Sequence, residues 1–295
     1  MFEGKPMKPL FIFISLFVFL FVSMPIYSKA IGDHPAAVVE LTIESHGKRM
    51  SGFSYLTAGE GSHPTILLLH GYPGNEKNLD VAQAMRSKGW NVVFFHYRGS
   101  WGSEGEFSFR GAEQDVQVVL DYMMKEENAS RLRIDPNQIS IVGHSMGGHM
   151  AIAGILDSPS VKCSVAYDGV NLGAKGVGFI NDPDTEINWS KYGDSLFMLK
   201  GWSGKKSKEE VTQHAVEFDL VRRADKINGR PVMLIAANTK VIPIELHIKP
   251  LFKALKATKK SQVFYKTIED DHSFSSSREE LINTTAKFLN SHCKD

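Results

Sequence analysis

The 295-residue sequence lacks an excess of charge of either sign, since 34 Lys and Arg residues face 33 Asp and Glu residues for a formal net charge of +1. Proteins that bind nucleic acid through general basicity carry a larger positive charge, so we expect no nucleic-acid partner. Neither a low-complexity tract nor an internal repeat stands out, so a repeat architecture is not expected either.

Cysteine is scarce, with Cys163 and Cys293 the two present. Two cysteines this far apart do not make a disulfide framework, although an exported protein can oxidise them. Because Cys163 lies in an apolar run typical of a buried strand, we expect a buried free thiol there.

Signatures of metal and cofactor binding are missing as well. His, Cys, Asp and Glu do not cluster at the spacing of metal ligands. The glycine-rich stretch 173–178 lacks the preceding strand and the following helix of a phosphate-binding loop. We therefore expect neither a metal nor a cofactor.

One long hydrophobic run is present, from Leu10 to Met24, and it follows Lys5 and Lys8. The small-x-small pattern Ser28-Lys29-Ala30 comes after it, which is typical of a secretory signal peptide cut after Ala30. The run is short for a membrane-spanning helix, which needs about 20 residues. We expect residues 1–30 to be a signal peptide of a periplasmic or secreted protein; the alternative is an uncleaved membrane anchor over residues 10–24.

The rest of the chain, residues 31–295, suits one α/β domain. An antiparallel pair of strands is expected first, at a sheet edge. From Thr65 onward, continuous apolar runs alternate with helical periodicity, which favours a mostly parallel eight-stranded sheet with helices on both faces. The expected strands span residues 37–43, 50–57, 65–69, 90–95, 138–142, 161–167, 231–237 and 262–268.

The alternation pauses at residues 171–230, where no strand is apparent. Ser207 and Glu210 have the spacing of a capping box, which predicts a helix running to about Leu220. We expect these residues, called the lid segment below, to form a small, partly helical lid inserted above the sheet. The alternative is an irregular connection with no role in substrate selection.

Ser145 lies in the pattern Gly143-His144-Ser145-Met146-Gly147, between an apolar run and a stretch of small and apolar residues. A strand, a sharp turn and a helix in this order are the setting of a nucleophile elbow. Glycine at 143 and 147 leaves room, because a Cβ there would collide with the neighbouring strand or helix. The backbone N–H of Met146 would then lie at a helix N-terminus, where negative charge is stabilised.

A serine hydroxyl needs a base within hydrogen-bond reach, and that base needs an acceptor to orient it. His272 follows the last expected strand and is the best placed of the 11 histidines. A second oxyanion donor is expected from the loop after the first parallel strand, and Tyr72 N–H is the candidate, since Pro73 has no N–H. His70 is expected to orient this loop by hydrogen bonding.

Taken together and in order, four motifs make residues of about 37 to 291 resemble the α/β-hydrolase superfamily, most of all bacterial hydrolases of the prolyl-oligopeptidase and dienelactone-hydrolase types. The resemblance implies a Ser/His/acid mechanism with an acyl-enzyme intermediate and no cofactor. The motifs are His70-Gly71-Tyr72-Pro73-Gly74-Asn75, His96-Tyr97-Arg98-Gly99-Ser100-Trp101-Gly102-Ser103, Gly143-His144-Ser145-Met146-Gly147-Gly148 and Asp271-His272-Ser273-Phe274.

The sequence departs from that superfamily at the acid, because Thr239 stands where its members commonly carry Asp or Glu. Asp168 is our first candidate for the acid, since some members carry it after the preceding strand. Glu245 is the alternative, and Asp270 and Asp271 adjoin His272 but are expected to point away from its Nδ1.

We therefore expect an exported serine hydrolase that cleaves a small-molecule ester, because ester leaving groups tolerate a weak acid member. Ser145 is the expected nucleophile and His272 the base. A peptidase or amidase acting on short peptides is one alternative, and a catalytically degenerate binding protein, motivated by Thr239, is another.

Overall fold

A computed structural model describes residues 1, 4 and 33–294 of the protein. The expected signal peptide, and the alternative anchor over residues 10–24, lie outside these described residues. From Asp33 onward the chain forms one structural unit.

The centre of the fold is one eight-stranded sheet with the strand order β1-β2-β4-β3-β5-β6-β7-β8. The expected antiparallel pair is confirmed, because β1 and β2 pair antiparallel at the edge of the sheet. Strand β2 also pairs antiparallel with β4. The remaining pairs, from β4 through β3 to β8 in the strand order, are parallel. The strands are β1 (Ala37–Ser45), β2 (Lys48–Leu56), β3 (His63–Leu69), β4 (Asn91–Phe95), β5 (Ile134–His144), β6 (Val161–Tyr167), β7 (Val232–Ala237) and β8 (Val263–Ile268).

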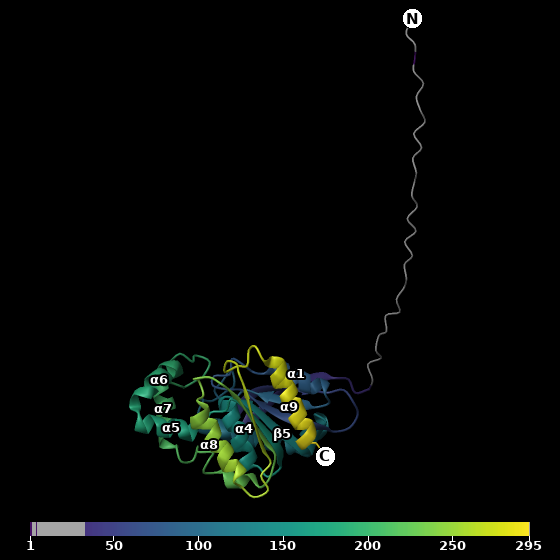
Figure 1. Ribbon diagram of the computed structural model, residues 1–295. Helices are drawn as coiled ribbons and strands as arrows, with labels where there is room; N and C mark the ends of the chain where they lie inside the picture. Colours follow the sequence, from purple (N-terminus) through teal and green to yellow (C-terminus); the bar gives the residue numbers. More distant parts are fainter. Residues whose placement is uncertain (2–3, 5–32, 295) are drawn as a thin grey trace. The chain divides into compact units, whose positions relative to one another are not determined.

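Helices cover both faces of the sheet, and α5, α6 and α7 of the lid segment gather at one side, away from α1 and α9 (Figure 1). The helices are α1 (Leu79–Ser87), α2 (Phe109–Met124), α3 (Glu126–Arg131), α4 (Met146–Asp157), α5 (Leu172–Asn181), α6 (Glu186–Asp194), α7 (Gly204–Gln213), α8 (Ile244–Lys256) and α9 (Arg278–His292), with short 3-10 helices η1 (Pro183–Thr185) and η2 (Ala224–Ile227).

Two hydrophobic cores lie on the two faces of the sheet. In β3, Leu67 and Leu69 belong to the core under α2, α4 and α8, whereas Ile66 and Leu68 belong to the core under α1 and α9. Successive side chains of a strand point to opposite faces, so a strand covered on both sides must be apolar at every position. This requirement explains the continuous apolar runs in the sequence.

The expected capping box in the lid segment is wrong. The N-cap of α7 is Ser203, whose hydroxyl accepts a hydrogen bond from Lys206 N–H at 3.2 Å, and the helix ends at Gln213. Glu210 instead caps a different helix: its carboxylate accepts from the N–H groups of Phe109 at 3.0 Å and Arg110 at 2.9 Å, at the start of α2. Free N–H groups at a helix start favour an anion, so tertiary contact redirects this side chain.

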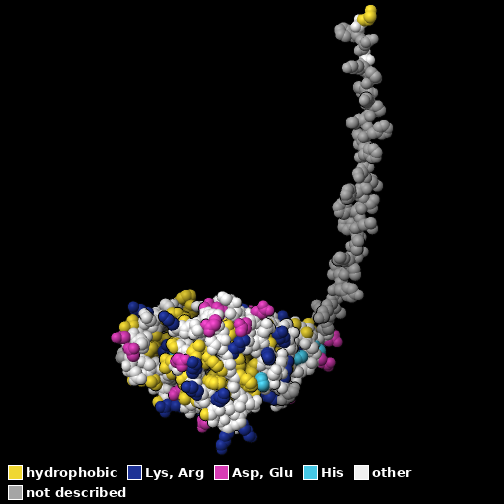
Figure 2. Space-filling view, viewed as in Figure 1, with side chains coloured by type: hydrophobic (Ala, Val, Ile, Leu, Met, Phe, Trp, Pro, Cys, Tyr) yellow, Lys and Arg dark blue, Asp and Glu magenta, His cyan; other side chains and the backbone are white. Residues whose placement is uncertain are grey.

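Basic and acidic side chains are interspersed over the face of the molecule that Figure 2 shows, in keeping with the near-zero net charge. Within residues 33–294 no helix is both long and apolar enough to cross a membrane.

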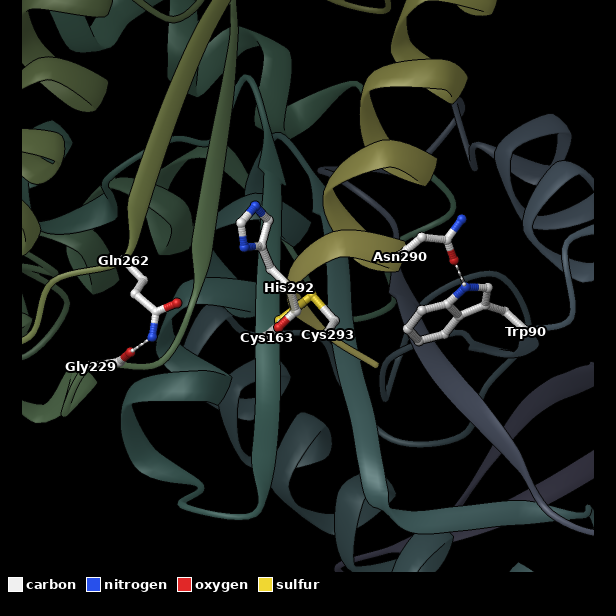
Figure 3. The surroundings of a disulfide bond; sticks show 7 residues. All are labelled: Trp90, Cys163, Gly229, Gln262, Asn290, His292 and Cys293. Carbon is white, nitrogen blue, oxygen red and sulfur yellow. Dashed lines mark hydrogen bonds between the residues drawn. A yellow bond between two sulfur atoms is a disulfide. The ribbon is translucent and has the colours of Figure 1, made fainter. Parts of the chain in front are cut away.

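The expectation of a free thiol at Cys163 is wrong, because Cys163 and Cys293 form a disulfide (Figure 3). It joins β6 to the end of α9, with Cα atoms 5.6 Å apart across a sequence separation of 130. Close by, Trp90 Nε1 donates to Asn290 Oδ1 at 3.2 Å, which ties the same helix to the residue just before β4. Helix α9 brings Cys293 to Cys163, and the spacing of the two cysteines in the sequence does not reveal this proximity.

We expect the double variant Cys163→Ser/Cys293→Ser to lose about 2–5 kcal/mol of unfolding free energy, because the disulfide restricts the unfolded chain over a long loop. Urea denaturation followed by circular dichroism measures this loss. Reductant should lower the stability of the wild type and leave that of the double variant unchanged. Equal stability of both proteins under oxidising conditions would contradict the prediction.

Candidate functional site

Ser145 occupies a strained turn between β5 and α4. Its φ of 59° and ψ of −118° lie in a region that residues other than glycine rarely adopt. The turn is held on both sides: Ser145 N–H donates to the Tyr167 carbonyl at 2.9 Å, and the Ser145 carbonyl accepts from Gly148 N–H at 3.0 Å and Val170 N–H at 3.2 Å. The expected elbow geometry is confirmed.

The two glycines that flank Ser145 are required by close backbone contacts. A Cβ at Gly143 would lie 1.9 Å from the Gly147 carbonyl oxygen in α4, and a Cβ at Gly147 would lie 2.2 Å from the Leu69 carbonyl oxygen in β3. Real Cβ atoms do not approach backbone this closely. The predicted reason for both glycines is therefore confirmed.

His272 and Asp168 meet at the same edge of the sheet, although they are 104 residues apart. His272 Nδ1–H donates to Asp168 Oδ2 at 2.5 Å, and Asp168 Oδ1 accepts from Ala237 N–H at 3.1 Å. The Asp168 side chain is fully buried. Burial raises the pKa of Asp168, while the bonds from His272 and Ala237 act in the opposite direction.

The other acids considered from sequence do not reach His272. Glu245, the alternative acid, is exposed and pairs with Lys249 one helical turn along α8, so the structure does not bring it to the site. Asp270 and Asp271 instead accept backbone N–H bonds within their own loop, as their expected orientation implied. Thr239 Oγ1 accepts from Val241 N–H at 3.2 Å, a local turn contact.

The residues of both expected oxyanion donors, Tyr72 and Met146, line the same cavity as Ser145. Met146 is the first residue of α4, so its N–H has no acceptor within that helix. The loop after β3 also approaches Ser145 closely, because a Cβ at Gly71 would lie 3.0 Å from Ser145 Cβ. As predicted, His70 bonds this loop, donating from Nδ1 to the Gly71 carbonyl at 2.9 Å, and burial lowers the pKa of His70 to about 3.

Sequence reasoning missed His144, the residue before Ser145. Its Nε2 lies 2.7 Å from the His272 carbonyl oxygen, and because a carbonyl only accepts, Nε2 carries the proton. Burial is the main cause that lowers the pKa of His144 to about 3, so His144 is neutral. Its neutral ring holds the backbone of His272 in place through this hydrogen bond. The signal in the sequence that could have indicated this role is a polar ring within a run of small and apolar residues.

Ser145, His272, Tyr72 and Met146 line one cavity of about 480 Å³. The lid segment forms one side of it, and the remaining wall comes from loops at the carboxyl ends of the parallel strands. The other lining residues are Phe109, Val170, Leu172, Lys175, Thr185, Asn188, Trp189, Tyr192, Val241 and Ile242. Mostly apolar cavities of 300–1,000 Å³ with a few polar groups are typical of small-molecule sites.

The lid segment also holds the Tyr72 side chain. Trp202 Nε1 donates to the Tyr72 hydroxyl at 2.7 Å, and Trp189 stacks on its ring with centroids 5.3 Å apart. Burial raises the pKa of Tyr72 to about 12. The loop that carries the candidate oxyanion donor is therefore positioned in part by the lid segment.

Within residues 33–294, no group of three or more His, Cys, Asp or Glu side chains is arranged to hold a metal ion.

The strand order together with an elbow serine, a histidine after the last strand and a buried aspartate at the same sheet edge define the α/β-hydrolase fold. Comparison with known proteins agrees. The BD-FAE family model matches residues 55–163. The lysophosphatidylserine lipase ABHD12 of Danio rerio is 34% identical over 100 residues, which are 33% of this chain and 24% of that protein.

Two solved structures share the fold over 88% of this chain. An acylaminoacyl peptidase of Pyrococcus horikoshii superposes with a TM-score of 0.66 at 17% identity, with 42% of its own length covered. An esterase of Pyrococcus furiosus superposes with a TM-score of 0.64 at 18% identity and is covered over 92%. This chain thus spans less than half of the lipase and of the peptidase. It has the α/β-hydrolase fold.

We expect the His272–Asp168 hydrogen bond to give a proton NMR signal far downfield of the backbone amides, because Nδ1–H donates to a buried carboxylate. The signal should vanish in Asp168→Asn and persist in the matched control Glu245→Gln. Its persistence in Asp168→Asn would show that another group orients His272.

Proposed function

We propose that this protein is a serine hydrolase that cleaves an ester. The observation that carries the proposal is the contact of 2.5 Å between His272 Nδ1 and Asp168 Oδ2, in a cavity that His272 shares with Ser145. Asp168 orients the ring so that Nε2 is the free nitrogen and stabilises the imidazolium that forms during reaction. Within the described residues the Ser145 hydroxyl and His272 are not hydrogen-bonded, and such bonds often tighten only when substrate is present.

In the proposed reaction, Ser145 Oγ attacks the ester carbonyl carbon while His272 Nε2 takes the hydroxyl proton. The N–H groups of Tyr72 and Met146 stabilise the oxyanion of the tetrahedral intermediate. The intermediate expels the alcohol, which receives the proton from His272, and leaves an acyl group on Ser145. Water then repeats the sequence, with His272 as base, and releases the acid.

The cavity supports an ester of a small molecule as substrate. Its lining is mostly apolar and aromatic, and the lid segment bounds it, which favours a compact apolar ligand over a polypeptide. The presence of Asp168 beside His272 removes our sequence-based reason for an ester, namely a weak acid member. Cleavage of an amide bond in a short peptide therefore remains the alternative, and the acylaminoacyl peptidase shares the fold.

The alternative of a catalytically degenerate binding protein is less well supported, because Asp168 can orient His272 in place of a carboxylate at position 239. A fluorophosphonate probe, which reacts with activated serines, decides this point. Labelling of the wild type that is lost in Ser145→Ala supports an enzyme, and absence of labelling supports a binding protein.

We expect the residue 31–295 protein to hydrolyse p-nitrophenyl esters, and Ser145→Ala to remove this turnover. Asp168→Asn should lower kcat by about 10⁴, the loss seen when the aspartate of a protease triad is neutralised. Glu245→Gln is the matched control and should keep wild-type activity, because Glu245 lies on the surface of α8. A chain-length series of esters, run beside the corresponding p-nitroanilides, separates esterase from amidase.

We also propose that the protein is exported by residues 1–30. The disulfide between Cys163 and Cys293 supports this, since disulfides persist in oxidising compartments. Mass spectrometry of the protein recovered from its host should find a mature N-terminus at Ile31. An intact N-terminus in the membrane fraction would instead support the anchor over residues 10–24.

A further inference from the structure

Lys175 is a cation inside the candidate active-site cavity, and neither the fold nor the proposed reaction needs it there. It lies on α5 of the lid segment and lines the cavity together with Ser145 and His272. A lysine placed among apolar and aromatic walls is costly unless a partner compensates for lost hydration. Burial accordingly lowers the pKa of Lys175.

The protein itself supplies no anion to Lys175. In the part of the chain that the structure describes, its ammonium makes neither a salt bridge nor a hydrogen bond, and no Asp or Glu is among the residues lining the cavity. Its contacts are with ring faces: Nζ lies 5.3 Å from the ring centroid of Trp189 and 5.7 Å from that of Phe179. Such contacts hold a cation in place without neutralising its charge.

His247, a titratable group that feels the charge of Lys175, does not offset this charge either. His247 is buried, and burial followed by the charge of Lys175 lowers its pKa to about 3, so its ring is neutral. Other lysines of the lid segment are paired or point to solvent: Lys208 binds Glu186 at 2.9 Å, and Lys191 on α6 is exposed. Lys175 therefore differs from them in both location and partners.

We propose that Lys175 binds an anionic group, a carboxylate or a phosphate, on a substrate whose apolar body fills the rest of the cavity. The inference rests on the proposed function, since it names the substrate class of the same site. Trp189 and Phe179 hold the ammonium, Asn188 and Thr185 offer further polar groups in the same wall, and the apolar residues contact the body of the substrate. The preferred substrate is then an ester that carries one negative charge on the part that contacts Lys175.

Equilibrium binding tests the subsite without turnover. Isothermal titration of the residue 31–295 protein compares 4-phenylbutyrate and 3-phenylpropyl phosphate with the neutral 4-phenyl-1-butanol. A partly buried ion pair should make an anion bind about tenfold to a hundredfold tighter than the alcohol. The better of the two anions identifies carboxylate or phosphate as the preferred group.

Three variants assign the effect to Lys175. Lys175→Met should remove the preference for anions while leaving the alcohol's affinity unchanged, and Lys175→Arg should retain the preference. Lys191→Met, on the exposed surface of the same segment, is the matched control for net charge and should behave as wild type. Equal affinity of the wild type for anion and alcohol would overturn the proposal, as would an equal loss in Lys175→Met and Lys191→Met.

Turnover separates this inference from the proposed function. Two esters are compared: the p-nitrophenyl monoester of suberate ends in a carboxylate, whereas p-nitrophenyl octanoate ends in a methyl group. If both esters are hydrolysed through Ser145 with equal kcat/KM, the proposed hydrolase function is supported and the anionic subsite is rejected. If neither ester is hydrolysed but 4-phenylbutyrate still binds through Lys175, the proposed hydrolase function is rejected and the anionic subsite is supported.

Discussion

The close packing of β5, α4 and β3 around Ser145 is the constraint on which the site depends. Backbone oxygens of α4 and β3 occupy the space that a Cβ at Gly143 or Gly147 would need. This packing allows the chain to reverse from strand to helix at a strained residue, and a network of backbone bonds from β6 and its following loop sustains the strain. The same approach places the loop after β3 against Ser145.

Asp168, the candidate acid, links the ends of three strands of the sheet. Asp168 follows β6, yet its carboxylate accepts from Ala237 N–H at the end of β7, the strand beside it. The carboxylate thereby reaches the end of β7, the strand after which superfamily members commonly carry the acid, and it meets His272 after β8. Thr239 is left to stabilise a local turn.

The lid segment and the sheet depend on one another. Glu210 of α7 caps the start of α2, and Trp189 and Trp202 hold Tyr72, which belongs to the loop beside Ser145. The loops at the sheet edge form one wall of the cavity, and α5 and α6 form the other wall. The cavity lining and the loop that carries Tyr72 are thus linked through aromatic contacts, and Lys175, whose Nζ lies over the Trp189 ring, also lines the cavity.

The sequence by itself determined the eight strands, the elbow at Ser145 and the position of His272, because burial on both faces and a tight strand-to-helix turn impose local residue patterns. It favoured Asp168 over Glu245 as the acid, and the packing of the sheet edge brings the Asp168 carboxylate to His272 Nδ1. Tertiary structure alone decided the disulfide, the capping of α2 by Glu210 and the bond from His144 to His272. Each joins groups distant in sequence, and such contacts leave no periodic trace in the chain.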